Sequence, residues 1–89
     1  MINENDFPKF KYFMEAYIAD YADFLEQAYE FSKSESIRTI NKLKNEVMAL
    51  SSKKEAWEVQ SFLIRKYGIR IRQKEVPIIF EEILKGLGS

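Results

Sequence analysis

The sequence contains no cysteine and no histidine among its 89 residues. Without cysteine, the chain has no disulfide framework and no thiolate that could act as a nucleophile or a metal ligand. Without histidine, it lacks the usual general base of enzymes and the commonest metal ligand. The sequence also has no glycine-rich phosphate loop and no nucleophile elbow. We therefore expect a protein without catalytic residues, without a metal site and without another cofactor.

Net charge, turn-forming residues and long apolar runs are also scarce. Basic and acidic residues number 14 each, so no overall charge draws the chain toward nucleic acid or a membrane surface. Three glycines and two prolines leave little material for the turns of a β-rich fold. No apolar run approaches the roughly 20 residues of a membrane-spanning helix, and the N-terminal residues lack the apolar core of a signal peptide. We expect a cytoplasmic protein with a single domain, residues 1–89.

Apolar residues recur at spacings of three and four through most of the chain, which is the period of amphipathic helices. The predicted helices span approximately residues 7–20, 22–31, 33–50, 53–67 and 77–85. Ser32 and Ser52 are each followed three residues later by glutamate, the capping-box pattern of a helix start. Gly68 suits the left-handed position after a helix end. Residues 69–72 alternate between isoleucine and arginine, and we predict an extended connector there.

The apolar positions of these helices define the expected core of an all-α fold, a single compact bundle of four to five short helices. Met48 and Ile64 fall outside the predicted core positions. The expected core residues are Phe10, Phe13, Met14, Tyr17, Ile18, Tyr21, Phe24, Leu25, Ala28, Phe31, Ile37, Ile40, Leu43, Val47, Leu50, Trp57, Val59, Phe62, Leu63, Ile79, Phe80, Ile83 and Leu84.

Charge is unevenly distributed along the chain although the total is zero. Residues 12–32 contain five acidic residues and no basic one, whereas residues 65–74 contain five basic residues and no acidic one. Each run is compatible with an ordinary solvated surface. An acidic surface also suits the binding of a basic protein, because complementary potentials speed association. A basic connector could instead contact phosphates.

The distribution of aromatic residues favours protein binding over nucleic-acid binding. Nine of the thirteen aromatic residues, including four of the five tyrosines, lie in residues 7–31, beside the acidic residues. Tyrosine is enriched at interfaces because it offers a large rigid contact area and one hydrogen bond. A single tyrosine is equally compatible with a half-buried position at the edge of the core. The candidate binding residues are Asp20, Tyr21, Asp23, Glu26, Tyr29 and Glu30.

The order of these motifs resembles the helical immunity proteins of bacterial contact-dependent growth inhibition systems. In chain order the shared features are Phe7-Pro8-x-Phe10, Tyr12-Phe13, Tyr17, Asp20-Tyr21 and an acidic helix ending at Phe31, then Tyr67-Gly68, Pro77 and Phe80-Glu81-Glu82-Ile83-Leu84. The family more often has tryptophan where Tyr21 and Phe80 stand here. The resemblance implies a cytoplasmic protein that binds one cognate toxin domain, often a nuclease, and neutralises it by covering its active site.

These observations favour a non-catalytic, monomeric immunity protein that binds a basic toxin domain one to one. Two alternatives remain open. One is a small nucleic-acid-binding regulator that uses Arg65, Lys66, Arg70, Arg72 and Lys74. The other is a homo-oligomeric helical scaffold, for which Met48 and Ile64 are the only indications.

Overall fold

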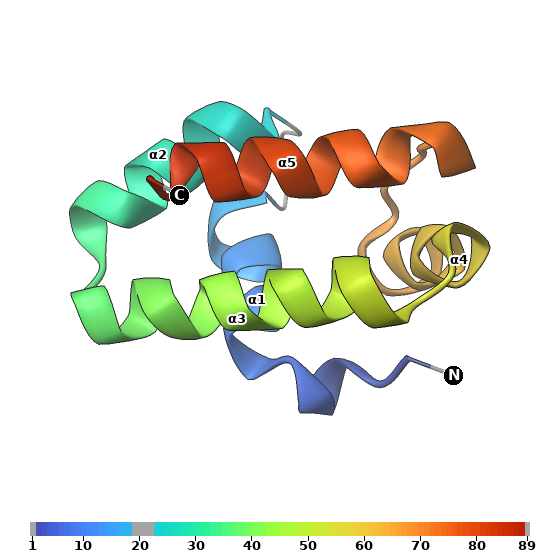
Figure 1. The fold of residues 1–89 in the computed structure, drawn as a ribbon, viewed down its shortest axis with the longest axis horizontal. Helices are drawn as coiled ribbons and strands as arrows, with labels where there is room; N and C mark the ends of the chain where they lie inside the picture. Colours follow the sequence, from blue (N-terminus) through green and yellow to red (C-terminus); the bar gives the residue numbers. More distant parts are fainter. Residues whose placement is uncertain (1, 19–22, 89) are drawn as a thin grey trace.

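The computed structural model describes residues 2–18 and 23–88, and these residues form helices joined by short connections (Figure 1). No β-strand occurs among them. The elements are η1 (Glu4–Asp6), α1 (Pro8–Phe13), the π-helical turn η2 (Met14–Ile18), α2 (Phe24–Ser34), α3 (Ile37–Lys53), α4 (Ala56–Tyr67), η3 (Gln73–Glu75) and α5 (Val76–Gly86). The predicted all-α bundle is confirmed.

The helices surround one apolar core. Helix α2 packs along α5, α3 packs on α1 and α5, and α4, seen nearly end-on, contacts the first part of α5 (Figure 1). The largest fully buried side chains are those of Phe10, Phe13, Phe31 and Phe62, which come from the three helices α1, α2 and α4. No helix in residues 2–18 and 23–88 combines the length and apolarity that crossing a membrane requires.

Three residues expected in the core lie on the surface. Leu25 is 37% exposed, Trp57 is 58% exposed and Ile37 is 77% exposed. Ile37 and Trp57 lie in the first turns of α3 and α4, where the helix begins at the edge of the bundle. Helical spacing identifies the apolar side of a helix but not how far the neighbouring elements extend along it. Tyr21, also expected in the core, lies outside the described residues.

Two predicted helix starts are displaced toward the C-terminus. Helix α2 continues through Ser32, whose hydroxyl donates to the Tyr29 carbonyl at 2.6 Å instead of capping a new helix. Ser36 is the N-cap of α3 and accepts from the Thr39 amide. Likewise α3 includes Ser52 and runs to Lys53, so the second expected capping box does not form.

The start of α1 is held by a side chain from another helix. Phe7, its N-cap residue, makes no side-chain hydrogen bond. The Glu46 carboxylate of α3 instead accepts from the amides of Lys9, at 3.2 Å, and Phe10, at 2.8 Å. The first amides of a helix have no partner within it, so Glu46 satisfies two of them and fixes α1 against α3.

Helices α2 and α5 cross closely because Gly86 has no side chain. A Cβ added at Gly86 would lie 2.6 Å from the Ala28 Cβ and 2.6 Å from the Leu25 carbonyl oxygen. Both distances are below any van der Waals contact. The sequence predicts Gly86 to end the last helix, and the structure makes it both the last residue of α5 and a point of close approach to α2.

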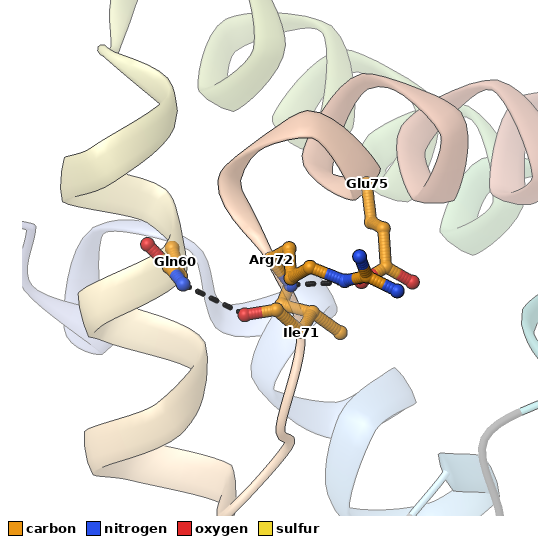
Figure 2. Close-up of polar contacts among 4 residues, drawn as sticks. All are labelled: Gln60, Ile71, Arg72 and Glu75. Carbon is orange, nitrogen blue, oxygen red and sulfur yellow. Dashed lines mark hydrogen bonds and ion pairs between the residues drawn. The ribbon is translucent and has the colours of Figure 1, made fainter.

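The connector between α4 and η3 is extended, as predicted. Gly68 ends α4 with φ +67, in the left-handed region. Ile69 and Ile71 pack partly buried against the core, and the amide side chain of Gln60 donates to the Ile71 carbonyl at 2.7 Å (Figure 2). Arg70, which lies between the two isoleucines, and Arg72, which follows Ile71, are exposed. The alternating pattern therefore places the connector flat against the bundle, with its arginines in solvent.

Candidate partner-binding surface

Helix α2 carries most of the predicted binding residues, and Asp23 begins it. The Asp23 carboxylate accepts a hydrogen bond from the Glu26 amide at 3.0 Å, which makes Asp23 the N-cap of the helix. Phe24, Ala28 and Phe31 face the core. The spacing of these buried residues fixes the rotation of α2, so the residues between them face outward.

The outer face of α2 consists of Leu25, Glu26, Tyr29, Glu30 and Lys33. Tyr29 is 55% exposed, and Glu26 is also exposed. The structure thus brings together three of the predicted binding residues, Glu26, Tyr29 and Glu30, on one solvent-facing surface. Asp20 and Tyr21 lie outside the described residues.

Lys33 alters the electrostatics of this face. Its ammonium nitrogen lies 3.6 Å from a carboxylate oxygen of Glu30 and 4.8 Å from the centre of the Tyr29 ring. The lysine therefore offsets part of the acidic charge and orders the Tyr29 ring by a cation–π contact. Asp23 is engaged as a helix cap, whereas Glu26 makes no ion pair within residues 2–18 and 23–88.

A cluster of two tyrosines and one carboxylate, not predicted from the sequence, lies at the other end of α2. The hydroxyls of Tyr12 and Tyr17 both donate to the Glu35 carboxylate, each at 2.7 Å. Their rings meet edge to face, 6.1 Å apart between centres. Residues five apart on an α-helix point about 140° apart. The wider π-helical turn of η2 brings the two tyrosines to the same side.

The hydrogen bonds of this cluster shift the ionisation of its members. Bonds from Tyr17 and then Tyr12 lower the pKa of Glu35, because they favour the charged carboxylate. Burial, followed by the bond to Glu35, raises the pKa of Tyr17 to about 12. The bond to Glu35 is the main cause that raises the pKa of Tyr12. The spacing of residues in the sequence could not reveal the partner of Tyr12, because Glu35 lies 23 residues away.

The basic residues of segment 65–74 are exposed. Within the described part of the chain, four of them make no ion pair: Arg65, Lys66, Arg70 and Lys74. Arg72 lies 3.5 Å from the Glu75 carboxylate and also donates its backbone amide to that carboxylate (Figure 2). Apart from Arg72, the basic residues of this segment therefore present their charges to solvent without an ion pair among the described residues.

One hollow of the surface is lined mainly by apolar side chains. It has a volume of about 270 Å³ and lies where the end of α3 meets the first turns of α4 and α5. Its lining includes Leu50, Val59 and Phe80, and its only charged residues are Lys54 and Glu81. Among the described residues, no group of three acidic, histidine or cysteine side chains could hold a metal ion.

Comparisons of the chain with protein-family models, curated proteins and solved structures found no match.

Proposed function

We propose that this protein is an immunity protein, which binds a cognate toxin domain in the cytoplasm and neutralises it without catalysis. The observation that carries the proposal is the outer face of α2, where the exposed Tyr29 lies beside Glu26 and Glu30. Tyrosine anchors and carboxylates together suit a basic protein surface, such as the phosphate-binding cleft of a nuclease. The motif order that resembles helical immunity proteins supports the same function.

The rigidity of this face also supports a binding role. Phe24, Ala28 and Phe31 fix α2 in the core, and the Lys33 ammonium orders the Tyr29 ring. A side chain that is already ordered loses less conformational entropy when a partner binds it. The outer face of α2 therefore provides an anchor whose ordering cost is small.

The first experiment identifies the partner. The tagged chain is purified from cells that also express the genes next to its own. We expect it to retain, in equal amount, a polypeptide that stops growth when it is expressed alone and is harmless when it is co-expressed with this chain. Recovery of nucleic acid alone, or of no partner, would contradict the proposal.

The second experiment tests the binding face. We expect the triple variant Glu26→Lys, Tyr29→Ala, Glu30→Lys to bind that toxin at least tenfold more weakly, because loss of one aromatic anchor alone costs about 2 kcal/mol. Asp23 is left intact so that α2 keeps its cap. Glu81→Lys, which reverses an exposed charge on α5, serves as the control and should bind normally. Equal affinity of the triple variant and the control would exclude the outer face of α2 as the interface.

A further inference from the structure

The outward side of α4 carries the only tryptophan of the chain. Trp57 is 58% exposed, and Ile64, seven residues later, is 44% exposed. Residues seven apart lie on the same side of a helix, about 10 Å from each other along its axis. Val59, Phe62 and Leu63 occupy the buried side of α4. Two large apolar side chains are therefore presented to solvent from one face of a well-anchored helix.

The basic connector runs beside this face. Gln60 lies between Trp57 and Ile64 on the same side of α4, and its side-chain amide donates to the Ile71 carbonyl (Figure 2). The hydrogen bond fixes the connector alongside the middle turn of the helix. Arg70 and Arg72, on either side of Ile71, are exposed. The helix that presents the apolar pair thus holds beside it the connector that carries Arg70 and Arg72.

The charge beside Ile64 and along the connector is positive, whereas Glu55 and Glu58 flank Trp57 in the sequence. Arg65 follows Ile64 on α4, and neither Arg65 nor Arg70 makes an ion pair within the described residues. The carboxylate of Glu75 neutralises only Arg72 in part, at 3.5 Å on the exposed surface. Arginine and tryptophan are the residue types most enriched among binding hot spots.

We propose that Trp57, Ile64, Arg65, Arg70 and Arg72 form a second binding surface, here called the α4–connector surface. Its occupant is an acidic polypeptide segment that places apolar side chains on Trp57 and Ile64 and carboxylates on the arginines. Bidentate pairing between arginine and carboxylate supplies orientation, and the apolar contacts supply affinity. This proposal goes beyond the toxin-binding function and does not depend on the outer face of α2.

A polypeptide fits this surface better than a nucleic acid does. Surfaces that bind single strands stack successive bases on several aromatic side chains. Among the described residues, Trp57 is the only aromatic side chain exposed on α4, and its neighbour two turns away is the aliphatic Ile64. Two apolar contacts about 10 Å apart match the two-turn spacing of an amphipathic helix.

The test uses the fluorescence of Trp57 in the full chain. The probe is a synthetic helical peptide rich in glutamate, with two leucines seven residues apart. We expect it to shift the Trp57 emission to shorter wavelength, with a dissociation constant between about 1 and 100 μM. A peptide with lysine at every glutamate position and a single-stranded thymidine oligonucleotide are measured in parallel, and both should leave the emission unchanged.

Charge-reversal variants test whether the acidic peptide binds at the α4–connector surface. We expect the double variant Arg65→Glu, Arg70→Glu to bind the acidic peptide at least tenfold more weakly, while its circular dichroism stays unchanged. The control, Arg38→Glu with Lys42→Glu, makes the same charge change at exposed positions of α3 and should bind within twofold of the unmodified chain.

Four results would overturn the proposal. They are no emission change at peptide concentrations up to about 1 mM, equal binding of the lysine peptide, tighter binding of the oligonucleotide, and an emission shift on raising the concentration of the chain alone. The last result would identify a second copy as the occupant.

Discussion

At the scale of single residues, one carboxylate links the C-terminal end of α2 to α1 and η2 through hydrogen bonds. Glu35 follows α2, whereas Tyr12 and Tyr17 belong to α1 and η2. Two hydroxyl donors on one carboxylate oxygen make stronger hydrogen bonds to the charged carboxylate than to the neutral acid. The stabilisation from this cluster therefore depends on pH.

The first prediction concerns acid unfolding. The pKa of Glu35 is lower in the folded chain than its ordinary value of 4.5, so its stabilisation is complete above pH 4.5 and is lost as the pH falls through the folded-state value. We expect Glu35→Gln to be less stable at pH 7 and to lose less stability between pH 5 and pH 3 than the unmodified chain. Urea unfolding across that range measures both effects. If the free energy of unfolding depended on pH in the same way for the two proteins, the prediction would be contradicted.

The second prediction contrasts two tyrosines. Tyr17→Phe removes a hydrogen bond to a charged group and should lower the free energy of unfolding by roughly 1 kcal/mol. Since the pKa of Tyr17 is raised from 10.0 to about 12, its contribution is complete below pH 10 and is lost as the pH rises toward 12.

Tyr67→Phe is the matched control for Tyr17→Phe. The Tyr67 ring packs against Phe10 and Phe62, and its hydroxyl is buried without a hydrogen-bond partner in the described part of the chain. Burial is the main cause that raises the pKa of this tyrosine. Removing an unsatisfied buried hydroxyl costs no bond, so Tyr67→Phe should leave stability unchanged or increase it. A loss as large as that of Tyr17→Phe would contradict this contrast.

The spacing of apolar residues in the sequence predicts which side chains are buried, but it does not predict which residues a surface side chain contacts. The periodicity identifies Phe10, Phe13, Phe31 and Phe62 as core residues because burial follows from the apolar side of a helix. The partner of a surface side chain depends on which elements meet there. Nothing in the sequence indicates that Tyr12 and Tyr17 share the Glu35 carboxylate.

At the scale of elements, the contact between α2 and α5 is limited by Gly86. The third prediction is that Gly86→Ala lowers the free energy of unfolding by about 1–3 kcal/mol, although alanine favours helix, because the added methyl meets the rigid Leu25 carbonyl. Thermal unfolding measures the change. Gly68→Ala provides a comparison in which no atom lies within 4 Å and only the backbone conformation is strained, at about 1 kcal/mol. A Gly86→Ala protein as stable as the unmodified chain would show that the two helices can move apart at no cost.

The fourth prediction concerns the link between α1 and α3. Glu46→Ala leaves the amides of Lys9 and Phe10 without their acceptor, and we expect a loss of roughly 1–2 kcal/mol in unfolding free energy. Glu81→Ala, at an exposed position of α5, should change stability by less than about 0.5 kcal/mol. Urea unfolding measures the free energy of unfolding of both variants. Equal decreases would show that the hydrogen bonds between Glu46 and the start of α1 contribute no stability.

The number of helices is predictable from the sequence, whereas their exact starts are not. Alternative capping serines lie close together, and the chain uses Ser36 rather than Ser32. The choice depends on whether the last turn of α2 remains buried, which is a property of the assembled bundle. Gly68 is predicted correctly because its left-handed conformation is a local requirement.

At the scale of the whole molecule, one core cluster receives side chains from η2 and from all five described α-helices. The radius of gyration, 11.7 Å, is close to the roughly 12 Å of a compact domain of this length. The fifth prediction is that far-ultraviolet circular dichroism and the near-ultraviolet signal of the tyrosines fall in a single urea transition. Two separated transitions would contradict the prediction of one domain.

The distribution of charge over the molecule shows how much of the candidate site could be predicted. The runs of like charge in the sequence correctly distinguish an acidic segment from a basic one. They do not show that Asp23 caps a helix or that Trp57 lies exposed beside the basic connector. Those facts depend on helix rotation and on contacts between distant segments.

The π-helical turn of η2 has a consequence for insertions and deletions. Such a turn contains one residue more than the α-helical path between the same ends. Ala16, exposed within it, is the residue whose deletion would allow α1 to continue as a regular helix. After that deletion Tyr17 would occupy the position four residues after Tyr12, which lies on the same side of an α-helix. The chain could therefore lose the extra residue of η2 and still bring both tyrosines to one carboxylate.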